Sequence, residues 1–285
     1  MTSTSTLERS AGERLAPVRW TRAQWMLLLV LCTVLALDAL DVSMVGVALP
    51  SIGTELHLGT ESLQWIVSAY VLGYGSLLLL GGRMADLLGR RRIFLIALSV
   101  FAAASLLGGL VDDPALLIAT RFVKGLAAAF TAPAGFSIIT TNFAEGRERN
   151  RAVSIFTTFG ASGFSLGLVV GGLMTAMSWR WTFLVSVPVA VAVVILGLKY
   201  IPRDGSAGRA EGKDQDSGHD VWGAVTLAAG MLGLVYTLVS APGNGWGSVA
   251  TIAGFLVSAA VLAAFAVIEN RVRGTRPSND FVHVM

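Results

Sequence analysis

Charged residues are scarce in this 285-residue chain, where Asp, Glu, Lys and Arg make up only 14% of the sequence. Soluble domains carry about 25% charged residues. The charged residues of this chain are too few to cover the surface of a water-soluble protein of this size. Cys32 is the single cysteine, which excludes an intramolecular disulfide framework and a cysteine-rich metal site. Proline is sparse, at 8 residues, and the 32 glycines follow no three-residue period, which excludes disorder and collagen. Apolar residues make up 54% of the chain and the mean hydropathy is +0.69, so we predict an integral membrane protein.

Eight apolar stretches are each long enough to cross a membrane, which takes about 20 mainly apolar residues in a helix. They lie at residues 25–49, 63–81, 93–111, 114–140, 152–177, 181–201, 221–240 and 249–268. None shows the strict alternation of a lipid-facing barrel strand, and the first is too long for a cleaved signal peptide. The predicted fold class is therefore an all-α integral membrane protein with about eight transmembrane helices.

The basic residues indicate how the helices are oriented. Of the 21 Lys and Arg, 18 fall in the two tails and in alternate loops, whereas the opposite loops hold only Arg180. The positive-inside rule places the basic side in the cytoplasm, so both termini are predicted to be cytoplasmic. Topology explains the net charge of +3, and nucleic-acid binding is not expected.

A polar, Gly- and Ser-rich segment at residues 202–220 divides the spans into six and a following pair. This composition is typical of a flexible linker. The predicted domains are a cytoplasmic tail at 1–24, a six-helix bundle at 25–201, the cytoplasmic linker at 202–220, a helical hairpin at 221–270 and a second cytoplasmic tail at 271–285. The three histidines fall in loops or tails, and no metal site is expected.

Four ionisable residues lie well inside the predicted spans, away from their ends: Asp38 and Asp41 on the first, and Arg121 and Lys124 on the fourth. Each pair has the spacing i, i+3 and so projects from one helix face. The helical rise places Asp41 and Arg121 about 12 Å, and Asp38 and Lys124 about 16 Å, below the outer ends of their helices. The charges can neutralise one another, either as a structural ion-pair cluster or, as we favour, in coupling or substrate binding. In a coupling role a carboxylate carries the proton, because Arg stays charged.

The turn after the second span reads GRMADLLGRRR over residues 82–92. Glycine provides the backbone angles of a short turn, and a lone Asp at a helix start complements the helix dipole. The string resembles G-x-L-A-D-x-x-G-R-[KR], the loop signature of the major facilitator superfamily. The resemblance implies that Gly82, Asp86, Gly89 and Arg90 form a cytoplasmic gating loop.

Further strings resemble patterns of the same superfamily and of its fourteen-helix drug:proton antiporter branch. Residues 121–128 look like R-x-x-Q-G-x-G-A, residues 40–50 are similar to L-D-x-T-x-x-N-V-A-L-P, and residues 179–183 read WRWTF. The resemblance ties Arg121 to proton coupling and places Asp41 in the central cavity.

Residues 163–172 resemble the antiporter pattern G-x-x-x-G-P-x-x-G-G through Gly163, Gly167, Gly171 and Gly172. Glycines at i, i+4 also permit close helix packing, and we favour that simpler role.

Three positions depart from the family patterns: Lys124 stands in place of Gln, Leu168 in place of Pro, and Gly46 in place of Asn. The missing Pro removes a helix distortion and weakens the inference of antiport. Lys124 adds a buried charge, for which we expect Asp38 to be the partner.

The resemblance implies two six-helix halves around a central site, and the chain offers the first half plus the extra hairpin. We therefore expect a truncated member of the family. The leading function is proton-coupled efflux of drugs or other small amphipathic compounds, with the proton gradient as energy source and no cofactor. The alternatives are a small-solute symporter and a non-transporting membrane fragment that is inert or pairs with a second half-transporter. No nucleophile–base set is visible, so no enzyme is expected. The expected partners are the lipid bilayer, a small-molecule substrate and protons.

Overall fold

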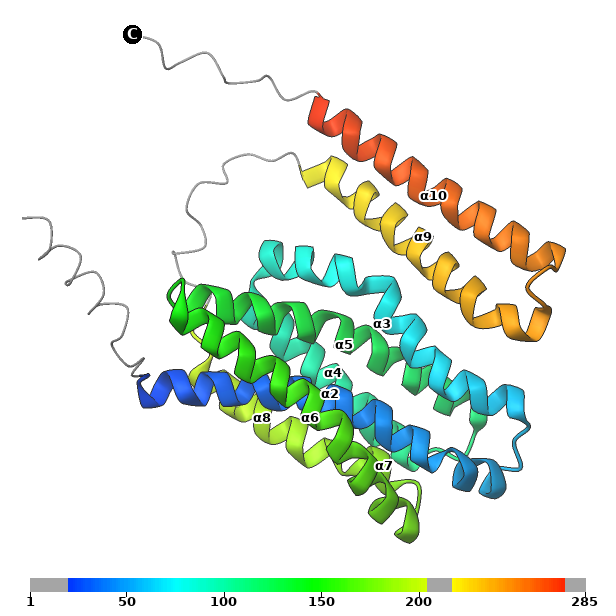
Figure 1. Cartoon of the computed structure of the whole chain (residues 1–285), viewed down its shortest axis with the longest axis horizontal. Helices are drawn as coiled ribbons and strands as arrows, with labels where there is room; N and C mark the ends of the chain where they lie inside the picture. Colours follow the sequence, from blue (N-terminus) through cyan, green and yellow to red (C-terminus); the bar gives the residue numbers. More distant parts are fainter. Residues whose placement is uncertain (1–19, 204–216, 275–285) are drawn as a thin grey trace, which may run out of the picture.

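The computed structural model describes residues 20–203 and 217–274, and this part of the chain is helical without strands. The helices are α2 (Arg22–Glu55), α3 (Thr60–Leu88), α4 (Arg90–Leu110), α5 (Pro114–Asn142), α6 (Arg147–Met177), α7 (Trp181–Leu184), α8 (Ser186–Tyr200), α9 (Ser217–Asn244) and α10 (Val249–Gly274) (Figure 1). Most of the two predicted tails and of the predicted linker, at residues 1–19, 204–216 and 275–285, lies outside the described residues.

The described residues contain eight segments long and apolar enough to cross a membrane, which confirms the predicted number of spans. The sixth consists of α7 and α8 together. Several helices extend beyond the predicted spans: α2 continues through Pro50 to Glu55, α3 extends to Leu88, and α9 begins at Ser217, within the segment predicted as a linker. Hydropathy marks the part of a helix that lipid surrounds, whereas the backbone hydrogen bonds of the helix continue beyond it.

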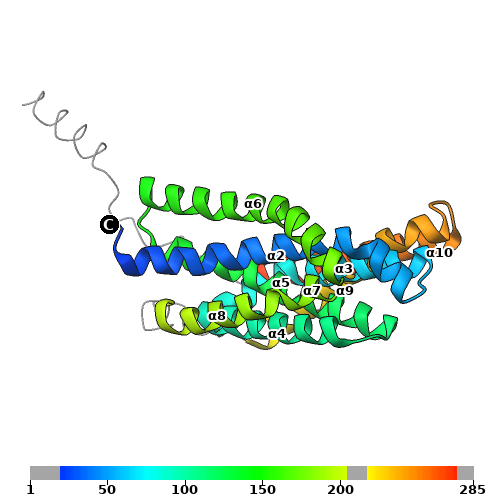
Figure 2. The ribbon, with the colours of Figure 1, turned by 90° about the horizontal axis from the view of Figure 1, so that it is seen from below.

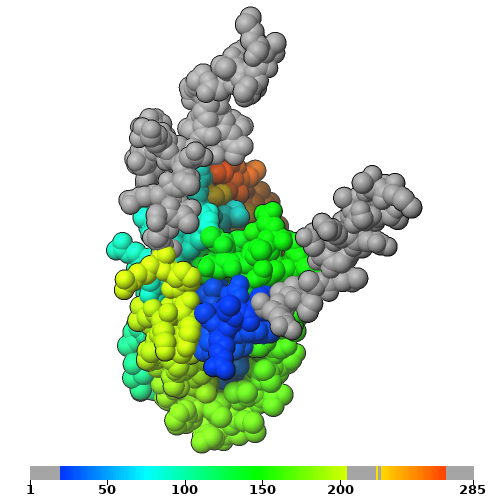
Figure 3. Space-filling view, turned by 90° about the vertical axis from the view of Figure 1, so that its left-hand side faces the viewer, coloured from blue at the N-terminus to red at the C-terminus, as the bar shows by residue number. Residues whose placement is uncertain are grey.

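The first six spans form one bundle, and α9 and α10 form a hairpin beside α3 (Figure 1). Within the bundle α2 packs against α6, while α5 packs against both α3 and α4. Figure 2 shows α6 on one side of α2, with α4 and α8 on the opposite side. Figure 3, an end-on view, shows that the start of α2, the start of α6 and the end of α8 gather at one end. These ends carry basic residues of the predicted cytoplasmic side, including Arg22, Arg147 and Lys199.

Helices α3 and α5 approach so closely that only glycine fits at their contact. A Cβ atom on Gly125 would lie 2.1 Å from the carbonyl oxygen of Tyr70, and one on Gly81 would lie 2.2 Å from that of Ala129. Close backbone approach through small residues is the usual way in which helices associate in lipid. This contact fixes α5, which carries Arg121 and Lys124, against the helix that carries Tyr70.

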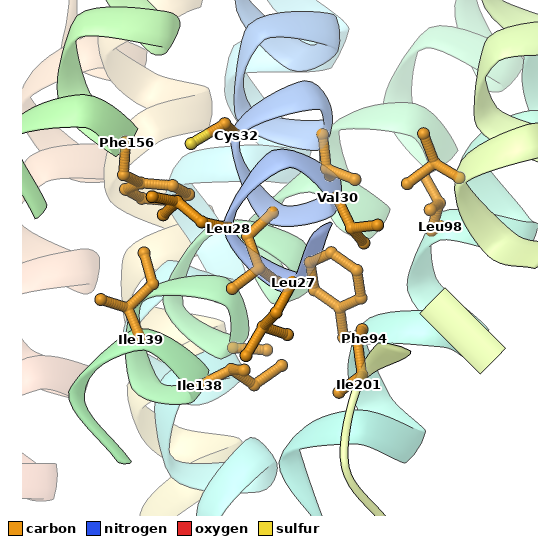
Figure 4. Close-up of a cluster of buried hydrophobic side chains, with 14 of the residues drawn as sticks. Leu27, Leu28, Val30, Cys32, Phe94, Leu98, Ile138, Ile139, Phe156 and Ile201 are labelled. Atoms are coloured by element: carbon orange, nitrogen blue, oxygen red, sulfur yellow. The ribbon is translucent and has the colours of Figure 1, made fainter. Parts of the chain in front are cut away.

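Apolar side chains of α2 form the centre of the bundle near its predicted cytoplasmic end (Figure 4). Leu28 and Cys32 are fully buried there and pack with Phe94 of α4 and Ile139 of α5. Further along α2 the helix stays in the interior of the bundle. A charged side chain there needs a partner within the protein, because burying an unpaired charge is very unfavourable.

Candidate functional site

The four intramembrane charges predicted from the sequence lie in the interior of the bundle, between α2 and α5. Asp41, Arg121 and Lys124 have at most 1% of their surface exposed, and Asp38 has 6%. Uncompensated charges in such a place are very costly. Their partners therefore decide which of them can stay ionised.

Asp41 binds both cations of α5. Arg121 donates from Nη1 to Oδ2 of Asp41, and Lys124 donates from Nζ to Oδ1. Arg121 also donates from Nε to the carbonyl oxygen of Ile66 at 3.1 Å, and its guanidinium lies 4.7 Å from the ring centroid of Tyr70. The structure thus brings together three of the residues whose depths were predicted to match, and their role in transport stays a prediction.

The expected pairing of Asp38 with Lys124 is wrong. Oδ2 of Asp38 accepts a hydrogen bond from Oγ1 of Thr131 at 3.0 Å, and Oδ1 is buried without a partner. Among the described residues, no cation forms an ion pair with Asp38, because Lys124 points to Asp41. Residues at i and i+3 on a helix are rotated by about 60° from each other, which suffices to direct Lys124 to one carboxylate and not the other.

Two aromatic rings enclose the ammonium group of Lys124. Its Nζ lies 4.6 Å from the ring centroid of Phe101 on α4 and 5.2 Å from that of Phe183 on α7. A desolvated cation gains about 2 kcal/mol from such a contact. Sequence reasoning missed both rings, although Phe183 belongs to the WRWTF string at residues 179–183 that was singled out as a family pattern.

The same WRWTF segment holds the predicted outer ends of three helices together. Arg180 forms ion pairs with Glu55 at the end of α2 and with Asp112 after α4, and its guanidinium lies 4.4 Å from the ring centroid of Trp179. The hydrogen bond from Arg180 to Glu55 raises the pKa of the guanidinium. Arg180, the single basic residue of the predicted outer loops, therefore links helix ends through ion pairs. The distribution of charges along the sequence did not indicate these pairs.

The predicted gating loop is largely helical, because Gly82 and Asp86 lie within α3 and only Gly89 separates α3 from α4. Gly89 has φ of 99°, a conformation that residues with a Cβ rarely adopt. The expectation that Asp86 begins a helix is wrong, because it lies in the last turn of α3. The C-terminal end of a helix is the negative end of its dipole, which is unfavourable for a carboxylate. Arg90 compensates the charge of Asp86 through an ion pair of 2.9 Å between Nη2 and Oδ1.

Arg90 also connects the α3–α4 junction to the end of α5. Its Nη1 donates to the hydroxyl of Thr141 and, at 3.5 Å, to the carbonyl oxygen of Ser137. The hydroxyl of Ser137 donates in turn to Oδ1 of Asp86 at 3.4 Å. The motif therefore forms a small polar network across two helix ends. Gly82 lies outside this network, and a Cβ atom added there would have ordinary contact with Pro133.

The glycines of α6 face α2, as the packing interpretation expects, with one exception. A Cβ atom would lie 2.4 Å from the carbonyl oxygen of Ala36 at Gly163, 2.6 Å from that of Leu40 at Gly167, and 2.8 Å from Cα of Met44 at Gly171. Gly172 has no atom within 4 Å of such a Cβ, so it does not share this contact.

Buried charges in the interior of a bundle of membrane-spanning helices usually mark a functional site, such as the ion or substrate pathway of a transporter. The Major Facilitator Superfamily model matches residues 31–275, and the chain belongs to this family. The predicted family and fold class are confirmed, and the chain is a multi-pass membrane protein. The family is one of transporters and not of enzymes, in agreement with the sequence analysis.

Relatives in Streptomyces and Amycolatopsis carry names of antibiotic resistance and export. The chain is 38% identical to the puromycin resistance protein pur8 of Streptomyces alboniger over 94% of this chain and 51% of that protein. It is 39% identical to the cephamycin export protein CmcT of Amycolatopsis lactamdurans over 86% of this chain and 49% of that protein. The chain thus spans about half the length of the curated relatives it matches.

Solved structures agree on the fold. The POT family transporter PepTSo superimposes with a TM-score of 0.61 at 15% identity, over 92% of this chain and 56% of that one. A bacterial homologue of the human lysosomal transporter Spinster, in an inward-facing and occupied conformation, gives 0.58 at 18% identity, over 94% and 64%. At these identities the likeness concerns the fold alone.

Proposed function

We propose that this chain acts in the proton-coupled export of antibiotics or other small amphipathic compounds across the cell membrane, with both termini in the cytoplasm. The observation that carries the proposal is the buried group of Asp41, Arg121 and Lys124, in a chain similar to puromycin resistance and cephamycin export proteins. The proton gradient supplies the energy in this proposal, and no cofactor takes part.

The charges are not needed merely to hold helices together. The contact between α2 and α6 is built from Gly163, Gly167 and Gly171 against the backbone of α2, which is the economical solution in lipid. On its other side, the same helix α2 presents Asp41 to two cations of α5. Because small residues suffice to pack α2 against α6, the energetically unfavourable burial of charges between α2 and α5 supports a functional role for these charges.

In this proposal the Asp86–Arg90 network is a latch on the cytoplasmic side. Arg90 contacts Thr141 and Ser137 at the end of α5, the helix that also carries Arg121. A change in how α5 is held at that end therefore alters the position of the buried cations. This connection gives a physical route from the gating motif to the coupling group.

We further propose that residues 22–200 provide one six-helix half of the transport unit and that a second six-helix unit provides the opposite wall. The support is the family match, since transporters of this kind place the substrate site between two six-helix halves. The mass of the purified complex in detergent tests whether a second copy of the chain is this unit.

The experiment on function measures ethidium and puromycin accumulation in cells that express the full chain. A proton-coupled exporter lowers accumulation, and an uncoupler of the proton gradient removes the effect. The Arg121→Gln variant is expected to lose the lowering of accumulation. The Gly172→Ala variant is expected to keep it, because an added Cβ at Gly172 has no atom within 4 Å. Raised accumulation indicates an importer instead, and insensitivity to the uncoupler contradicts proton coupling. No effect on either compound, with the protein present in the membrane, contradicts export of both.

A further inference from the structure

Asp38 is a buried carboxyl group for which the structure provides too few partners. Its side chain is more than nine-tenths buried, Thr131 donates to Oδ2, and Oδ1 is buried with no donor among the described residues. Buried carboxylates in proteins are normally satisfied on both oxygens. A buried carboxyl oxygen that no donor reaches is far less costly in the neutral acid than in the carboxylate, because the acid carries no net charge.

Asp41, one turn further along α2, has the opposite environment. Both of its oxygens are occupied by separate cations, Arg121 on Oδ2 and Lys124 on Oδ1. Adding a proton to Asp41 would leave two buried positive charges without their anion, which is strongly unfavourable. Asp41 is therefore fixed as a carboxylate, and it is poorly suited to take up a proton.

We propose that Asp38, and not Asp41, is the carboxyl group that binds and releases the transported proton. The inference deepens the proposed function and rests on it for the direction of transport. On release, the O–H bond of the carboxyl breaks, the proton passes to water and the electron pair stays on the Asp38 carboxylate. On binding, the carboxylate takes a proton from water and becomes neutral. No other reactant is required.

The surroundings of Asp38 favour both states in part. Asp41, Arg121 and Lys124 together carry a net charge of +1, so an ionised Asp38 makes the whole group neutral. Burial and the unpartnered oxygen favour the neutral acid instead. A group held between two such opposing influences can exchange its proton during a cycle.

The remaining titratable groups near Asp38 do not replace it. Tyr70 and Tyr74 on α3 carry phenol groups whose ring centroids lie 6.3 Å apart, and a phenol does not release its proton in the physiological pH range. The part of α6 that packs against α2 at this level, residues 160–171, carries glycine, apolar and hydroxyl side chains and no titratable group. Of the two buried carboxyl groups among the described residues, Asp38 and Asp41, Asp38 is the one without an ion pair.

The test is difference infrared spectroscopy of the purified full chain in lipid nanodiscs, without substrate, during a pH titration. The C=O stretching band of a protonated buried carboxyl group is expected in the wild type and is expected to disappear in Asp38→Asn. It is expected to remain in Asp38→Glu and in Gly172→Ala. Thr131→Val is expected to shift the band, because the hydrogen bond to Oδ2 is lost.

Several outcomes overturn the proposal. A band that persists in Asp38→Asn, or one lost in Asp41→Asn while that variant stays folded, assigns the proton elsewhere. A wild type that shows no such band at any pH also overturns it. If Asp38→Asn does not fold, the band of Asp38→Glu and its shift in Thr131→Val decide the question. The spectra require no transport, so they can succeed where the export experiment fails, and the two failures are distinguishable.

Discussion

Replacing Gly163 with alanine places a methyl group where α6 meets the backbone of α2. The new Cβ would lie 2.4 Å from the carbonyl oxygen of Ala36 and 2.7 Å from its Cα, whereas ordinary contact begins at 3.4 Å. The two helices must therefore separate by about 1 Å, and overpacking of this kind costs about 1–3 kcal/mol. Backbone atoms cannot swing aside as a flexible side chain does, so the cost is not easily relieved.

Gly172 supplies a control on the same helix. A Cβ there meets no atom within 4 Å, so Gly172→Ala gains only the helix propensity of alanine over glycine, about 1 kcal/mol. Gly163→Ala gains the same amount and suffers the clash in addition. The difference between the two variants therefore isolates the packing contribution, and we expect Gly163→Ala to be less stable than Gly172→Ala by about 1–3 kcal/mol.

The measurement is the unfolding of each purified variant in mixed micelles with increasing sodium dodecyl sulfate, followed by circular dichroism. The free energy of unfolding is compared at one lipid and detergent composition for both variants. If Gly163→Ala is as stable as Gly172→Ala, the contact between α6 and α2 is not close, and the packing interpretation of these glycines is wrong.

Three further predictions concern the predicted site and its surroundings. Asp41→Asn leaves Arg121 buried without its anion and should lower the free energy of unfolding by about 3–5 kcal/mol; an unchanged unfolding curve contradicts the buried ion pairs. Gly89→Ala forces alanine to φ of 99° and should lower it by about 1–3 kcal/mol, whereas Gly82→Ala should not lower it. Arg180→Gln removes partly exposed ion pairs and should lower stability by about 1 kcal/mol or less, an effect that disappears in high salt. The pKa of Arg180 is raised in the folded protein, so the stabilisation by its charge is fully present below the unfolded pKa and persists at moderately alkaline pH. A loss of stability at moderately alkaline pH would contradict the ion pairs of Arg180 with Glu55 and Asp112.

The number of spans and the family could be read from the sequence because each depends on local information. Lipid requires about 20 apolar residues in every crossing helix, and the backbone must satisfy its own hydrogen bonds there. Hydropathy alone therefore identified eight spans. It did not identify their ends, since α3 continues to Leu88 through the predicted gating loop. A helix can extend past the membrane without any change that hydropathy detects.

The depth of the charges was also local information. A rise of about 1.5 Å per residue put Asp41 and Arg121 at one level, and the structure has them in contact. Which carboxylate Lys124 chooses depends instead on how α2 and α5 are rotated toward each other. That rotation is set by contacts elsewhere, such as Gly125 against Tyr70, and no pattern within a single helix reports it.

The sequence by itself determined that this is a multi-pass helical membrane protein of a transporter family with four charges in its interior. Composition and spacing suffice for such statements because the solvent, lipid, acts on each segment separately. Only the tertiary structure decided that Asp41 pairs with both cations and that Asp38 has an oxygen without a partner. It also decided that the ring of Phe183 lies against the ammonium group of Lys124. These contacts join residues on different helices, and they exist only once packing has fixed every helix against its neighbours.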